Sequence, residues 1–230
     1  MEASAQATWD IGGSGEGSYE ADLEVVETIR SVTDADAVVE VVMRPTKVEE
    51  NGLPGPGYDE RSFSLRLAPN GEVLEVLEVD GVPASALDTD ELAFIGTYRP
   101  PLPDRRVRVG DSWEAEQALA LEDVFQELVT VGRLERFVPG ERDEVAGVSF
   151  KGQGPLRWTI SLPEGEARLT GTASVTGTAL IDMGEGLLRS ARSSTSGEFE
   201  VTVQPSDGSE PIAGSMHLTL GLVVRRAAAG

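Results

Sequence analysis

Several residue types that carry chemistry are scarce or absent in this sequence. It contains no cysteine, which excludes disulfides, thiolate nucleophiles and cysteine-ligated metal sites together. It contains one histidine, His217, which cannot build a histidine-rich metal site and has no serine or cysteine partner motif. Aromatic residues make up only 5% of the chain, which argues against a platform for stacking sugar rings. These absences remove most of the common catalytic and metal centres.

Long hydrophobic runs are also missing. No stretch of about 18 apolar residues occurs, so we expect no transmembrane segment. Residues 1–8 lack the basic region and apolar core of a signal peptide, and their small, polar side chains are typical of a mature N-terminus. We therefore expect any signal or lipid anchor to be absent from this chain.

Positive charge is scarce as well. Forty acidic residues against nineteen basic ones give a formal net charge of −21. The electric field of so negative a protein repels phosphate backbones and anionic bilayers, so we expect no nucleic-acid partner. An acidic excess of this kind more often serves solubility than binding.

Alternation of apolar and polar residues is abundant, and this period of two predicts β-strands. It is clearest near the C-terminus, where Leu156, Trp158 and Ile160 alternate with polar residues. Similar patterns mark residues 23–30, 37–43, 63–67, 73–79, 125–137, 144–150, 169–175, 199–203 and 216–224.

Strand length indicates how these strands assemble. Residues 187–204 would span roughly 60 Å at about 3.3 Å per residue, whereas ordinary strands have about five or six residues. So long a strand must bend, and Gly197 is placed to allow a bulge or kink. Long, bent antiparallel strands with one apolar face form a rolled sheet or half-barrel. The predicted fold class is therefore mainly β, with a concave side that holds either a core helix or a ligand.

A few segments depart from the strand pattern. Residues 1–18 are rich in glycine, serine and alanine, which predicts a flexible lead-in. Proline and glycine predict a loop over residues 45–60, either a connector or a lid. A capping box beginning at Asp88 predicts one short helix near 88–96. Residues 114–121 tolerate a helix by propensity, and residues 152–154 suggest a turn.

The strand pattern predicts a single β domain over residues 19–226. Alternatively, two related meanders, 19–98 and 111–226, are joined by the proline-rich segment 99–113. Three prolines make this segment a stiff, extended connector, and Trp113 follows it as an apolar anchor. Residues 64–74 and 178–188 share a rhythm of strand, glycine turn and strand, which duplication and shared turn chemistry explain equally well.

Candidate polar sites are weak. The acidic residues within 34–36 and 88–91 have a spacing found in calcium loops, but both lack the glycine and distal glutamate of such a loop. Turn and capping roles account for both clusters. The glycine-rich residues 12–17 lack the lysine of a phosphate-binding loop. We therefore expect no catalytic residue, no metal ligand and no cofactor.

Three large apolar residues, Trp113, Trp158 and Phe63, are the candidate ligand-binding residues because they could line an apolar pocket. An ordinary core explains the tryptophans as well, since burial of each stabilises the fold by about 2–3 kcal/mol.

Residues 102–113, LPDRRVRVGDSW, resemble an L-P-x-x-x-V-x-x-G-D-x-W element of uncharacterised bacterial exported proteins and lipoproteins. The layout of β-rich halves around this element is similar too, with a late Gly-x-Leu-x-x-Ser return at residues 186–190. The resemblance implies an extracytoplasmic location and a curved-sheet fold similar to periplasmic lipoprotein and lipid carriers. It carries over no catalytic residue, and this chain lacks the lipobox cysteine.

Together these observations favour a non-enzymatic, extracytoplasmic β-protein, periplasmic or at the cell surface, that binds a lipid or other apolar ligand on its concave face. Two alternatives stay open. One is a solid-packed structural or interaction module with a protein partner in the cell envelope, and the other is a hydrolase that uses a pair of carboxylates.

Overall fold

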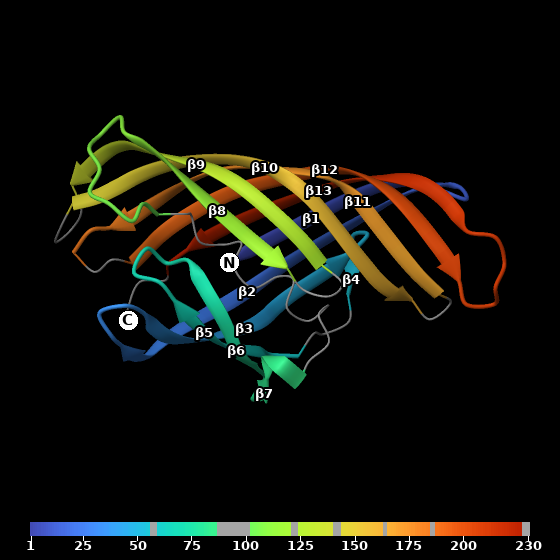
Figure 1. Ribbon diagram of the computed structural model, residues 1–230, viewed down its shortest axis with the longest axis horizontal. Helices are drawn as coiled ribbons and strands as arrows, with labels where there is room; N and C mark the ends of the chain where they lie inside the picture. Colours follow the sequence, from blue (N-terminus) through green and yellow to red (C-terminus); the bar gives the residue numbers. More distant parts are fainter. Residues whose placement is uncertain are drawn as a thin grey trace.

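The protein is one antiparallel sheet of thirteen strands over the residues that the computed structural model describes, which are 1–55, 59–86, 102–120, 124–139, 144–162, 165–184 and 187–226 (Figure 1). The first half contributes β1 (Glu2–Ile11), β2 (Ser14–Val32), β3 (Ala37–Glu50), β4 (Leu53–Pro54), β5 (Arg61–Leu67), β6 (Val73–Val79) and β7 (Val82–Pro83). The second half contributes β8 (Ser112–Ala120), β9 (Val124–Pro139), β10 (Glu144–Leu162), β11 (Gly165–Asp182), β12 (Leu187–Pro205) and β13 (Ile212–Arg225).

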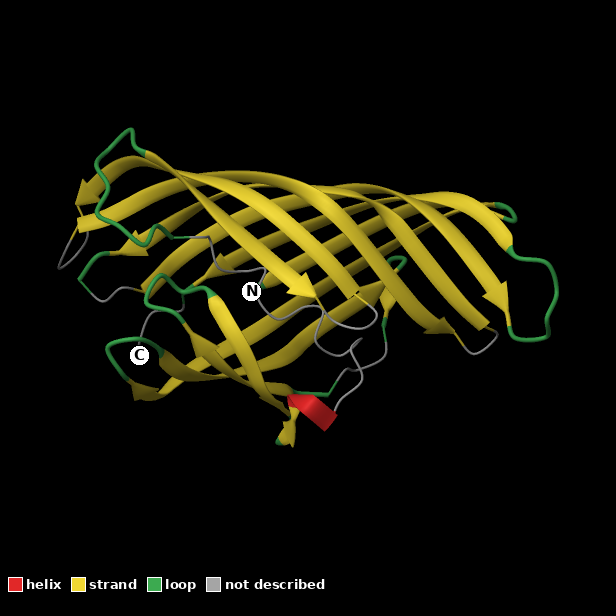
Figure 2. Cartoon of the chain, in the orientation of Figure 1, coloured by secondary structure: helices red, strands yellow, loops and turns green. Residues whose placement is uncertain are grey.

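Strand order in the sheet is β7-β6-β5-β3-β2-β1-β13-β12-β11-β10-β9-β8, and β4 pairs with the end of β3. Each half is a meander, and the two halves join where β1 pairs antiparallel with β13, from Glu2 opposite Val223 to Ile11 opposite Gly214. The two ends of the chain therefore meet in the middle of the sheet. Its free edges, β7 and β8, do not pair with each other. Figure 2 shows β8–β13 arching as a curved layer, with β5–β7 turned back beneath it.

The prediction of a mainly β protein with long, antiparallel strands in a curved sheet is confirmed. Four of the strands, β2, β10, β11 and β12, have 18 or 19 residues each. The predicted helix near 88–96 lies outside the described residues, whose only helical element is a 3-10 turn at Ala84–Ala86.

Bulges sit at other positions than the one predicted. The pairing of β12 is regular at Gly197, whereas the register shifts between Gly147 and Val148 and between Leu180 and Ile181. Gly197 instead makes room for the ring of Phe199, which occupies the space that a side chain at residue 197 would need. Of the predicted bulge or kink at Gly197, the bulge is therefore wrong.

The predicted flexible lead-in is replaced by strands. Residues 2–11 form β1, which is paired on both sides, and residues 14–18 begin β2. The glycines that suggested flexibility have local roles. Gly12 and Gly13, with φ of 67° and 157°, form the turn, and Gly15 lies under the indole of its registered partner Trp9.

Pairing with neighbours also extends strands into three segments predicted otherwise. Residues 45–50 and 53–54 of the predicted loop 45–60 are strand, because β3 continues to Glu50 before a turn at Asn51 and Gly52, whose φ values are 52° and 75°. Positive φ at both residues is the requirement of a tight hairpin turn. Residues 152–154 lie within β10, and residues 112–120 form β8 because they pair with β9. Tertiary pairing thus overrides local propensity.

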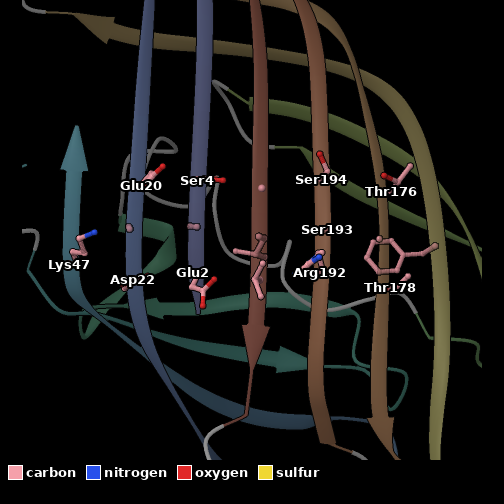
Figure 3. A pocket seen from close by; sticks show the side chains of 17 residues that line it. Glu2, Ser4, Glu20, Asp22, Lys47, Thr176, Thr178, Arg192, Ser193 and Ser194 are labelled. Carbon is pink, nitrogen blue, oxygen red and sulfur yellow. The ribbon is translucent and has the colours of Figure 1, made fainter. Parts of the chain in front are cut away.

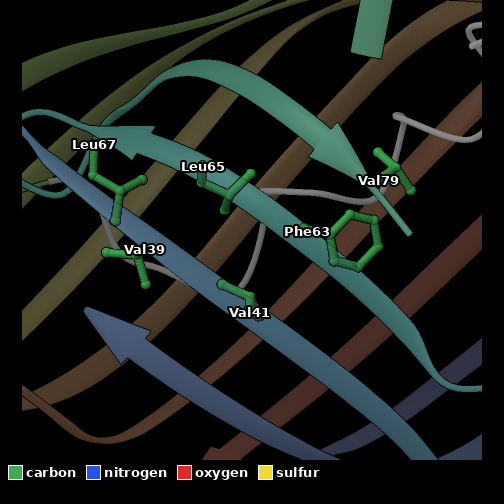
Figure 4. Packing of buried hydrophobic residues seen from close by; sticks show 6 residues of the cluster. All are labelled: Val39, Val41, Phe63, Leu65, Leu67 and Val79. Carbon is green, nitrogen blue, oxygen red and sulfur yellow. The ribbon is translucent and has the colours of Figure 1, made fainter. Parts of the chain in front are cut away.

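The core consists of three buried apolar clusters on one side of the sheet, which we call the inner face. The β5 cluster comprises Val39, Val41, Phe63, Leu65, Leu67 and Val79 (Figure 4). The Trp113 cluster comprises Trp113, Leu134, Ala146, Val148 and Ile181, and Leu102 and Val107 of the proline-rich segment pack against it. The Phe199 cluster comprises Ala167, Leu169, Phe199 and Val201.

Candidate functional site

The three candidate ligand-binding residues lie in three different places. Phe63 belongs to the β5 cluster and Trp113 to the Trp113 cluster, and both are under 10% exposed. Trp158 is half-buried and packs against the Phe199 cluster. The structure therefore does not bring these side chains together into one pocket, and each contributes to local packing.

The middle of the inner face, between these clusters, is apolar and less covered. Registered pairs across β1 and β13 place an alanine beside a leucine three times in succession. We call these six residues the Ala–Leu lane: Ala3 with Leu222, Ala5 with Leu220, and Ala7 with Leu218. All six are half-buried, whereas the side chains of the three clusters are buried. The registered neighbours of the lane are Ala21, Tyr19 and Gly17 on β2 and Ser193, Thr195 and Gly197 on β12. Alanine carries only a methyl group, so the alanine side of the lane is shallow. The longer side chains of the three leucines rise beside it.

Sequence reasoning missed the β1 side of this lane because residues 1–18 were expected to be loose. The signal was present, since Ala3, Ala5 and Ala7 alternate with polar residues at a period of two. Alanine is a weak strand former, and this obscured the pattern.

Polar groups border the lane on the β2 side. Tyr19 pairs with Ala5 on one side and with Glu50 of β3 on the other, so all three side chains face the same way. Burial raises the pKa of the Tyr19 phenol, and the nearby negative charge of Glu50 raises it further. The inner face thus offers a hydroxyl and a carboxylate at the margin of an apolar strip.

The opposite side of the sheet, the outer face, is polar, and two adjoining hollows lie on it. The larger, about 740 Å³, crosses seven strands from β3 to β10 (Figure 3). One row of its lining contains Lys47, Asp22, Glu2, Val223, Arg192 and Thr178, and another contains Glu20, Ser4, Gly221, Ser194 and Thr176. Leu220 and Tyr19, whose side chains point to the inner face and which precede the lining residues Gly221 and Glu20 in the sequence, do not line the hollow. The other lining residues, Ala21, Ala3, Leu222, Ser193, Gly177 and Phe150, form the row between these two, so the hollow is a furrow over that middle row, bordered by two rows of outward side chains.

The smaller hollow, about 470 Å³, adjoins the first and shares Thr178, Arg192 and Val223 with it. Its lining also includes Arg136, Glu135 and Arg225. None of Trp113, Trp158 and Phe63 lines either hollow. Two lane residues, Ala3 and Leu222, also line the larger hollow. The side chains of the lane and the charged side chains of the hollows nevertheless point to opposite faces of the sheet, because they alternate along the same strands.

Acidic and histidine side chains form no metal centre within the described residues, where no three of them gather. Near Asp34 and Asp36, the hydroxyl of Thr33 donates to the Asp36 carboxylate over 2.7 Å and accepts the Asp36 backbone N–H, which makes this segment a turn. The acidic residues within 88–91 lie outside the described residues. His217 is exposed on the outer face, with its Nε2 atom 3.3 Å from the hydroxyl of Thr219.

No helix with the length and hydropathy of a membrane span occurs in the part of the chain that the structure describes. Comparisons with protein families, with curated proteins and with solved structures find no match.

Proposed function

We propose that this protein is a non-enzymatic carrier that binds an apolar ligand or acyl chain on the inner face of its sheet. The observation that carries the proposal is the Ala–Leu lane, an apolar strip that stays partly exposed between buried clusters. A ligand chain lying along β1 would contact the three alanines below it and the three leucines beside it.

Hydrophobic burial would supply the affinity. Each methylene removed from water contributes about 0.8 kcal/mol, so a chain of several methylenes gains enough free energy for binding in the micromolar range. The open edges of the sheet suit such a ligand because the inner face can be reached without unfolding. An extracytoplasmic location is part of the proposal and is supported by the resemblance of residues 102–113 to the exported-protein element.

The test uses the purified chain with a dansyl-labelled undecanoic acid as probe, together with native mass spectrometry for retained lipid. Saturable probe fluorescence that unlabelled fatty acid displaces supports the proposal. Absence of both saturable binding and retained lipid contradicts it.

A matched pair of variants locates the site. Ala5→Trp fills the lane, whereas Gln6→Trp places the same side chain on the outer face one residue away. Exclusion of two methylenes removes about 1.6 kcal/mol, so Ala5→Trp should weaken probe binding about tenfold or more. Gln6→Trp should leave it unchanged. Thermal unfolding of both variants checks that they are folded, and Leu220→Gln tests the same lane without adding bulk.

A protein-interaction module is the second candidate, and the free edge of β8 favours it. This nine-residue strand pairs with β9 on one side and has no partner strand on the other within the described residues. An unpaired edge can accept a strand from another protein. The test is a pull-down from envelope extracts with the wild-type chain and with Glu114→Pro. A partner that the wild type captures and Glu114→Pro does not, together with no binding of the fatty-acid probe, would favour this candidate over the carrier.

A further inference from the structure

The smaller hollow on the outer face collects positive charge in a strongly acidic protein. Three arginines line it, Arg136, Arg192 and Arg225, against one acidic residue, Glu135. Three positive charges minus one negative charge leave a local excess of two, whereas the whole chain carries −21. The hollow is therefore positively charged in a protein whose net charge is strongly negative, and this difference needs an explanation.

Arg192 lies where the two hollows meet, and among the described residues no carboxylate occupies a position next to it on the outer face. The strand register defines the eight positions next to it on the outer face. They are Ser190, Ser194, Thr176, Thr178, Leu180, Gly221, Val223 and Arg225. Figure 3 shows Arg192 on its strand beside Ser194, with Thr176 and Thr178 on the neighbouring strand. Hydroxyl groups and a second arginine thus take the places where this chain elsewhere puts glutamate or aspartate.

Other arginines of the sheet are arranged differently. Arg30 contacts Glu40, Arg61 contacts Asp80 at 2.6 Å, and Arg66 contacts Glu75. Among the described residues, neither Arg192 nor Arg136 forms an ion pair within 4 Å.

The other charged residues of the hollow, Glu135 and Arg225, already have polar partners. Glu135 accepts a hydrogen bond of 2.5 Å from the Ser149 hydroxyl and lies 3.8 Å from Arg133. Arg225 has a loose, exposed contact of 3.7 Å with Glu2. Arg136 lies along the backbone of its partner Gly147, where a Cβ atom would be only 3.2 Å from the Arg136 Cγ atom. The absence of a side chain at Gly147 therefore lets Arg136 extend along the wall of the hollow.

We propose that the smaller hollow binds a phosphate group, either free or as part of a lipid headgroup. One guanidinium group can donate two parallel N–H hydrogen bonds to two oxygens of a phosphate. Neighbouring hydroxyl groups can donate further hydrogen bonds to the same phosphate. A phosphate monoester with two negative charges matches the local excess of two positive charges. The net charge of the chain does not prevent this, because charges farther away than about 8 Å are largely screened at physiological salt.

The site lies on the outer face and does not depend on the proposed apolar ligand. Its test uses inorganic phosphate as probe, titrated into the full chain at constant ionic strength and followed by calorimetry and by NMR of the phosphorus nucleus. Arg192→Gln should weaken binding by about 10- to 100-fold, the range for a lost hydrogen bond to a charged group. Arg168→Gln is the matched control, because Arg168 is an exposed arginine on β11 that pairs with Glu166 outside the hollow.

Vesicles of phosphatidylcholine with or without phosphatidic acid distinguish the two sources of the phosphate. Binding of inorganic phosphate that Arg192→Gln and Arg136→Gln weaken supports a free phosphate. Binding of phosphatidic-acid vesicles alone, sensitive to the same variants, supports a headgroup. The proposal is overturned if neither probe binds, or if Arg168→Gln weakens binding as much as Arg192→Gln does.

Discussion

The indole of Trp113 on β8 lies directly over Gly132, its registered partner on β9, and fills the space where a side chain of residue 132 would stand. The same relationship recurs across the sheet in Trp9 with Gly15, Phe150 with Gly177, and Phe199 with Gly171. Each ring covers the bare backbone of the neighbouring strand. Such aromatic–glycine pairs let a sheet curve sharply without exposing its hydrogen bonds.

Gly132→Ala should destabilise the protein by about 1–3 kcal/mol, the usual cost of overpacking a well-packed site. The added methyl group would collide with the Trp113 ring, which is under 10% exposed and cannot move aside freely. Urea unfolding measures the change in free energy.

A double-mutant cycle with Trp113→Leu provides the control. Because leucine leaves space over residue 132, Gly132→Ala should cost clearly less in that background. If Gly132→Ala lowered the free energy of unfolding equally in both backgrounds, the Trp113 ring would not be the reason that residue 132 is glycine.

Removal of Arg189 should destabilise the fold more than removal of any surface arginine. Asp182 is 4% exposed, and its Oδ2 atom accepts hydrogen bonds of 3.0 and 2.8 Å from Arg189. Arg189→Leu would remove the two charged donors from this buried carboxylate, whose Oδ1 atom keeps the hydrogen bond from the Gly184 N–H at 3.0 Å. We expect a loss of about 2–3 kcal/mol, below the value for a fully buried pair because Arg189 is partly exposed.

The comparison for this prediction is Arg168→Leu. Arg168 contacts Glu166 at 2.7 Å, but its side chain is 72% exposed. Exposed pairs contribute about 0–1 kcal/mol, so chemical denaturation should separate the two variants clearly. Similar losses for both would contradict the burial argument.

Tyr19 should titrate at a higher pH than an ordinary tyrosine. Burial is the larger cause of its raised pKa and the charge of Glu50 is the smaller one. Glu50→Gln should therefore lower the pKa of Tyr19 only part of the way towards the normal value. Ultraviolet difference titration of tyrosinate, with Tyr19→Phe to assign the signal, measures both values.

The sign of the effect on stability follows from linkage. Because the pKa of Tyr19 is higher in the folded state than its model value of 10.0, its contribution to stability is fully present below pH 10 and is lost as the pH rises through the folded pKa. Wild-type protein should lose stability over this alkaline range more steeply than Tyr19→Phe. The opposite order would contradict the burial of the phenol.

Sequence and structure agree for strands in which large apolar residues alternate with polar ones. The alternation at Phe63 and Leu65, or at Leu220 and Leu222, assigns each side chain to a face because successive residues of a strand point to opposite sides. The same reasoning failed for Ala3 and Ala5, since alanine and glycine carry little hydrophobic contrast.

The sequence by itself determined that the protein is mainly β, strongly acidic and without cysteine chemistry. Only the tertiary structure decided that β1 lies beside β13, that glycines such as Gly132 sit beneath aromatic rings, and that Arg192 has no carboxylate next to it. The physical reason is that alternation states which way a side chain faces but not which distant strand becomes its neighbour. Pairing across the sheet is non-local, and both the apolar lane and the cationic hollow are products of that pairing.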